Sequence, residues 1–93
     1  MTIWQQMVER KDEWIGGTLT ESDDDGHAFS TRITDLTMTK NPPSAGWYFT
    51  VEGEDFSAVC HTDYLGVSQY GVPEGSMGLA ASFGMRWVLT PPE

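Results

Sequence analysis

The sequence is poor in cysteine and in basic side chains, and both shortages exclude whole classes of protein. Cys60 is the only cysteine, so an intramolecular disulfide and a zinc site built from cysteines alone are excluded. Lys and Arg number 5 against 14 Asp and Glu, which gives a formal net charge of −9. The few basic residues are scattered and form no cationic surface for phosphates. We therefore expect no direct binding of nucleic acid and no binding to a membrane.

The chain also lacks a long apolar run. No segment approaches the roughly 20 apolar residues that cross a bilayer, and Met1–Met7 lacks the basic and apolar regions of a secretory signal. We therefore expect a cytoplasmic protein. What is present is 93 residues, of which 39% are hydrophobic and 12% aromatic. This is enough for a single folded domain over 1–93 with a thin core.

Apolar spacing at the start of the chain predicts a helix over 2–14. Thr2 is a suitable N-cap, and the pair Gly16-Gly17 would end the helix. Such an amphipathic helix needs an apolar surface to cover. The apolar side chains share one face at helical spacing: Ile3, Trp4, Met7, Val8, Trp14 and Ile15.

After the helix the apolar period changes to two, which is typical of strands. Leu36 and Met38 continue the second strand with shifted parity, which predicts a bulge near Asp35. A polar turn and a proline-containing break, at 21–26 and 41–46, separate the strands, and 62–76 is irregular. The alternation predicts about five antiparallel strands, at 15–21, 28–39, 47–52, 55–61 and 77–90.

These elements predict an α+β fold that is mostly β. An N-terminal amphipathic helix would be followed by a small, strongly bent sheet or a partly open barrel, with the helix closing one side or end. The expected core consists of the apolar positions that share a face: Met7, Val8, Leu19, Phe29, Ile33, Phe49, Val51, Phe56, Phe83, Met85 and Trp87.

Residues that could carry chemistry do not form a catalytic pattern. Cys60 and His61 are adjacent, and neighbouring residues of a strand point to opposite faces, so the thiol and the imidazole would not meet. Cys60 would face the core as an inert thiol. Paired carboxylates and a zinc site at His27 and His61 lack supporting spacing. We predict no catalytic residue, no metal site and no cofactor, and hence a protein that is not an enzyme.

The turn at 21–27 places acidic residues at the first, third and fifth positions of a calcium loop. The twelfth position should be a bidentate Glu, and it is Arg32. A calcium loop of the EF-hand type is therefore excluded. A solvated hairpin turn is expected, and weak divalent-metal binding aided by His27 is the alternative.

Half of the carboxylates lie in two turns of the predicted sheet. An up-and-down meander would bring its first and third turns to the same end. We expect an acidic tip there that attracts a basic partner protein. The candidate partner-binding residues at this tip are Glu21, Asp23, Asp24, Asp25, Glu52, Glu54 and Asp55.

The other end of the sheet is expected to carry aromatic side chains with few charges. Tyr48, Tyr64 and Tyr70 form a second candidate surface, because aromatic residues dominate the energetics of protein interfaces. The alternative is that these rings belong to the rim of a thin core.

Three functions follow as hypotheses. The first is a small acidic non-enzymatic module that binds another protein. The second is an acidic inhibitor that mimics nucleic acid and blocks a nucleic-acid-binding protein. The third is a binder of a small ligand or a divalent metal. A homodimer is also expected if the long apolar strand at 77–89 lies at an edge of the sheet.

Overall fold

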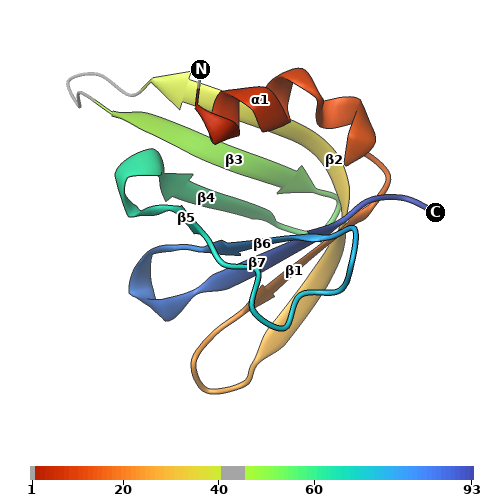
Figure 1. Cartoon of the computed structure of the whole chain (residues 1–93), viewed down its shortest axis with the longest axis vertical. Helices are drawn as coiled ribbons and strands as arrows, with labels where there is room; N and C mark the ends of the chain where they lie inside the picture. The colour runs from red at the N-terminus through yellow and green to blue at the C-terminus, as the bar shows by residue number, and fades with distance from the viewer. Residues whose placement is uncertain (1, 41–45) are drawn as a thin grey trace.

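The computed structural model describes residues 2–40 and 46–93, and it shows one helix packed on one antiparallel sheet (Figure 1). The seven strands are ordered β4-β3-β2-β1-β7-β6-β5, and the sheet is not closed. An α+β fold that is mostly β is thereby confirmed, with seven strands where about five were predicted. The strands are β1 (Thr18–Ser22), β2 (Ala28–Lys40), β3 (Trp47–Gly53), β4 (Ser57–His61), β5 (Gly66–Val67), β6 (Met77–Ala80) and β7 (Arg86–Thr90).

The N-terminal helix α1 (Ile3–Glu9) starts where its sequence predicts. Thr2 accepts a hydrogen bond from the Gln5 amide, and the Gln5 side chain accepts one from the Thr2 amide, which makes a complete capping box. The predicted end is wrong: the α-helix stops at Glu9, and a tighter 3-10 turn, η1 (Lys11–Glu13), continues the chain. This turn keeps Trp14 packed against the core.

The predicted bulge in β2 is confirmed, and it bends the sheet. The register with β3 shifts between Ile33 and Asp35. Before the shift Ile33 faces the core, and after it Leu36 does, so the buried parity changes as the sequence predicts. The first part of β2 pairs with β1 and the second part with β3. In Figure 1, β2 curves along one side of the molecule and joins its two halves.

The core fills the inside of this bend. Three large rings pack one after another across it. The ring centroid of Trp4 is 5.7 Å from that of Phe49, and the centroid of Phe49 is 6.5 Å from that of Trp87. Helix α1 packs along β2 and contributes Trp4 and Met7 to the core (Figure 1). The fully buried side chains are Trp87, Phe49, Leu19, Ile33, Leu36, Leu79, Leu89 and Val51.

The predicted last strand, 77–90, is wrong. The chain forms a hairpin of β6 and β7 joined by a 3-10 turn, η3 (Ser82–Gly84). β7 lies between β1 and β6, and β6 lies between β7 and β5. Beyond β5, the Gln69 side chain bonds the Gly78 amide and the Ser76 carbonyl. The premise of a dimer through an edge strand at 77–89 is therefore wrong.

Two of the expected core residues are exposed. Phe29 lies toward the end of the β1–β2 hairpin and is 66% exposed, although Thr31 and Ile33 on the same face of β2 are buried. Phe83 is 97% exposed, because it lies in the η3 turn and not in a strand. The core instead gains Trp4, Leu36, Leu65, Leu79 and Leu89, which the sequence-based core omitted.

The predicted break at 41–46 lies, apart from Gly46, outside the described residues. Within the described ranges, no helix has the length and apolar character needed to span a lipid bilayer.

The close packing of β6 against the segment beyond β5 can be tested at Gly78. A Cβ at this position would collide with the Ser68 carbonyl oxygen and would lie 2.5 Å from Val72 Cγ2. We expect Gly78→Ala to lower the free energy of unfolding by about 1–3 kcal/mol. Gly66→Ala is the matched control, since a Cβ there meets nothing within 4 Å. Urea unfolding of both variants is the measurement, and equal stabilities would contradict the packing.

Candidate functional site

The most exposed large apolar side chain is held out by the backbone of the η3 turn. Phe83 has φ 62° and ψ 30°, which lies in the left-handed region that residues other than glycine seldom occupy. The next residue, Gly84, also has a positive φ, of 72°. Because Ala81 N–H donates to the Met85 carbonyl across the turn, the tip is closed, and the ring of Phe83 projects from it.

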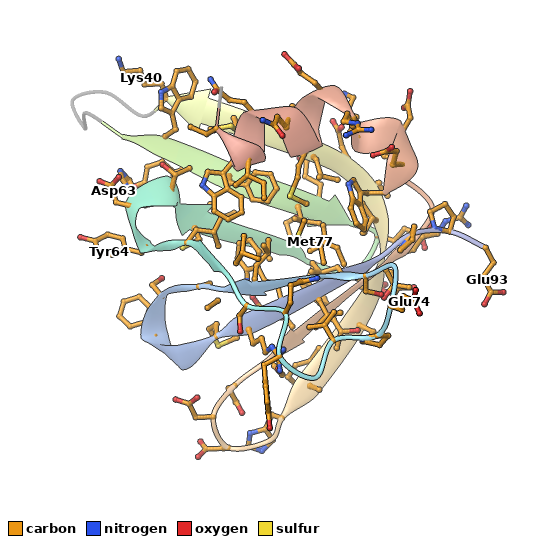
Figure 2. All side chains as sticks on the ribbon, in the orientation of Figure 1. Lys40, Asp63, Tyr64, Glu74, Met77 and Glu93 are labelled. Atoms are coloured by element: carbon orange, nitrogen blue, oxygen red, sulfur yellow. The ribbon has the colours of Figure 1, made fainter. Side chains whose placement is uncertain are left out.

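A second exposed ring lies on the turn that follows β4. This turn, η2 (Thr62–Tyr64), begins at His61, whose Nδ1 accepts a hydrogen bond from the Asp63 amide at 3.1 Å. The His61 ring packs between two tyrosines, with centroids 5.1 Å from Tyr48 and 5.7 Å from Tyr64. Tyr64 remains 69% exposed. Figure 2 shows Asp63 and Tyr64 pointing outward at this end of the molecule.

Tyr64 and Phe83 line one open hollow together with Ser82, and we name it the Tyr64–Phe83 hollow. Its volume is about 500 Å³. The two rings come from turns that are far apart in sequence, and both turns lie at the same side of the sheet (Figure 1). Behind the hollow, Ser82 Oγ lies 3.8 Å from Cys60 Sγ, which ties the η3 turn to β4.

Each of the two turns that carry the rings has a carboxylate on or against a residue next to the ring-bearing one. Asp63 directly precedes Tyr64, and its side chain is 79% exposed and lies 3.6 Å from His61 Nδ1. Asp24, at the tip of the β1–β2 hairpin, lies against Gly84, because a Cβ at Gly84 would collide with its carboxylate. Asp24, one residue of the predicted acidic surface, therefore lies next to the η3 turn that carries Phe83.

The two acidic turns themselves are not brought together. The amide of Asp55 donates to Thr31 Oγ1, and the amide of Glu54 donates to the Arg32 carbonyl, so the β3–β4 turn lies beside the middle of β2. The β1–β2 turn lies beyond Ala28, at the start of β2. Ala28 is four positions before Arg32, which corresponds to about 13 Å at strand spacing. The predicted joint surface of Glu21, Asp23, Asp24, Asp25, Glu52, Glu54 and Asp55 is thus divided into two parts.

The β1–β2 turn is organised by one carboxylate. Asp23 Oδ1 accepts hydrogen bonds from the amides of Asp25 and His27, both at 2.9 Å, and Oδ2 lies 3.1 Å from His27 Nδ1. The side-chain atoms of Asp23, Asp25 and His27 that could ligate a metal ion all lie within 4.8 Å of one another. Both oxygens of Asp23 already have partners within the turn, so the side chain acts as the brace of a hairpin.

The remaining sequence candidates do not share one site. Cys60 is buried, as its strand parity predicts, and its thiol lies 3.4 Å from the His61 carbonyl, not near the imidazole. Tyr48 is half-buried. Tyr70 is 90% exposed, and the Arg86 guanidinium donates to its carbonyl. Of the three predicted tyrosines, Tyr64 alone lines the hollow, and its partner there is Phe83.

Phe83 is the residue that reasoning from sequence missed, because its parity matches that of Leu79 and Trp87. The signal that could have located it is Gly84, which marks a turn inside the apparent strand. In comparisons of the chain with protein-family models, with curated proteins and with solved structures, nothing matches. The site is therefore interpreted from its own geometry.

Substitution of Phe83 separates a role in folding from a role at the surface. We expect Phe83→Gly to raise the free energy of unfolding by about 1 kcal/mol, because glycine adopts a positive φ without strain. Phe83→Ala keeps the strain and loses only an exposed ring, so its stability should equal that of the wild type. Thermal unfolding measures both, and a clear loss of stability in Phe83→Ala would show that the ring supports the fold.

The role of Asp23 as the brace of its turn can be tested against a neighbouring acid. Asp23→Ala removes the acceptor of two backbone amides and of the His27 ring, and we expect it to lower the free energy of unfolding by about 1–2 kcal/mol. Asp25→Ala removes one negative charge and leaves these contacts in place. Melting temperatures that change equally in both variants would show that the hydrogen bonds of Asp23 do not stabilise the turn.

Proposed function

We propose that this chain is a small non-enzymatic module that binds a basic protein through the Tyr64–Phe83 hollow. The observation that carries the proposal is the exposure of two large rings, Tyr64 at 69% and Phe83 at 97%, on separate turns that line one hollow. The cytoplasmic location expected from the sequence remains a prediction.

The energetics of these rings favour a role in binding. An exposed Phe gives up the roughly 1.5–3 kcal/mol that burial of such a side chain contributes, and its left-handed backbone adds a cost. Neither cost is recovered in the isolated chain, whose core is built from other residues. A partner that covers both rings would recover the apolar burial, and buried aromatic rings are typical centres of binding energy at interfaces.

The charge of the chain supports a basic partner. The net charge is −9, Asp63 lies within the η2 turn, and Asp24 lies against Gly84 of the η3 turn. A negative field at the docking end accelerates encounter with a positive surface, and salt screens this field beyond about 8–10 Å. Association should therefore be fastest at low ionic strength.

Affinity capture with matched variants tests the proposal. We expect wild-type protein to retain a specific partner at low salt, and the double variant Tyr64→Ala/Phe83→Ala to lose it while its fold stays intact. Phe29→Ala is the matched control, because Phe29 is an exposed ring that does not line the hollow. Equal retention by the double variant would overturn this docking site. Light scattering on the purified chain reports in parallel whether it forms a homodimer.

Mimicry of nucleic acid is a second candidate, favoured by one observation. The carboxylates are not gathered at one tip: the β1–β2 turn and the β3–β4 turn lie at different positions along β2. Mimicry makes the opposite prediction for the capture experiment. Charge reversal at Asp23, Asp24, Asp25, Glu52, Glu54 and Asp55 would abolish binding, and loss of the two rings would leave it unchanged.

A further inference from the structure

We infer that the Tyr64–Phe83 hollow receives the guanidinium group of an arginine side chain from the partner. This inference rests on the proposed function and adds to it the chemical group that the site recognises. The hollow is lined by two aromatic rings, those of Tyr64 and Phe83, and by one polar residue, Ser82.

Aromatic rings attract cations through the negative face of the π-system. The attraction contributes about 0.5–1 kcal/mol at exposed sites and about 2 kcal/mol when the cation is desolvated. Two rings on the walls of one hollow can both contact a planar guanidinium group, which stacks on aromatic faces and is more weakly hydrated than an ammonium group. An arginine side chain also places its apolar stem against the rings.

The charges around the hollow select a cation over an apolar or an anionic group. Asp63 follows the β4 strand on one side, with its side chain 79% exposed, and Asp24 lies against Gly84 on the other. Three of the five basic residues have partners elsewhere: Arg10 with Glu13, Lys11 with Asp35, and Arg86 with the carbonyls of Ser68 and Tyr70. A cation entering from a partner therefore meets aromatic faces and carboxylates together.

The two turns fix the backbone from which the rings project without the partner. His61 supports Tyr64 through a ring contact and begins the η2 turn by accepting the Asp63 amide. Ser82 contacts the buried Cys60 at the base of the η3 turn. Because these supports come from the core side, the backbone of both turns is positioned before binding, which reduces the entropy lost on association.

The test uses a short arginine peptide and its citrulline counterpart, which has nearly the same shape and no charge. Titration of isotope-labelled protein at low salt, followed by NMR, should give saturable shifts for the amides of 63–64 and 82–84 with Ac-Gly-Arg-Gly-NH2. We expect the citrulline peptide to bind at least about fivefold more weakly. Equal affinity for both peptides, or no saturable shift with the arginine peptide, overturns the inference.

Two variants separate a cation–π contact from simple apolar packing. Phe83→Leu keeps an apolar side chain without a π face and should weaken arginine binding about two- to fivefold, while Phe83→Tyr should retain it. Asp63→Asn should weaken binding and reduce its dependence on salt. Undiminished binding in Phe83→Leu overturns the inference.

The outcomes also distinguish this inference from the proposed function. If capture of the protein partner depends on Tyr64 and Phe83 but the citrulline peptide binds as well as the arginine peptide, the docking surface stands and its selectivity for arginine is wrong. If the arginine peptide binds and the double variant still captures the partner, the site recognises a cation, and the partner docks elsewhere.

Discussion

The bend of β2 is the constraint on which the rest of the structure depends. Its 13 residues pair with β1 along the first part and with β3 along the second, and the register shift between Ile33 and Asp35 changes which side chains face inward. A straight strand would leave the two halves of the sheet side by side in one layer. The bent strand folds them toward each other, so that Phe49 from one half packs on Trp87 from the other, and Trp4 of the helix packs on Phe49.

The candidate site is a consequence of that bend. The sheet is bent but its outer strands, β4 and β5, are not paired with each other. The turns η2 and η3 meet at this open side, where the core contributes Cys60 and Leu65 and the solvent side carries Tyr64 and Phe83. The gap between the unpaired strands β4 and β5 is thus also the place where the two exposed rings come together. The β1–β2 hairpin extends past the core to the same region, which places Asp24 beside Gly84.

Sequence periodicity predicts the parts of this fold that depend on alternation. The N-cap at Thr2, the bulge near Asp35 and the inward thiol of Cys60 all follow from local spacing, and all are confirmed. Prediction from alternation fails at 77–90. The η3 turn keeps the apolar residues of β6 and β7 at the same odd-numbered positions, so in the sequence the hairpin looks like one continuous strand. Phe83 was assigned to the core for that reason, and its positive φ depends on the turn geometry. The pairing of Tyr64 with Phe83 requires the bend of the sheet to bring the η2 and η3 turns together, which no local pattern contains.

The central claim is that two exposed rings on separate turns form one recognition site for a cationic side chain. Intermolecular nuclear Overhauser effects between the labelled protein and the unlabelled arginine peptide test it most directly. The arginine Hδ protons should show contacts to the ring protons of both Tyr64 and Phe83 in the same sample. Contacts to neither ring, or to other exposed side chains such as Phe29 or Val59 in their place, would contradict the claim.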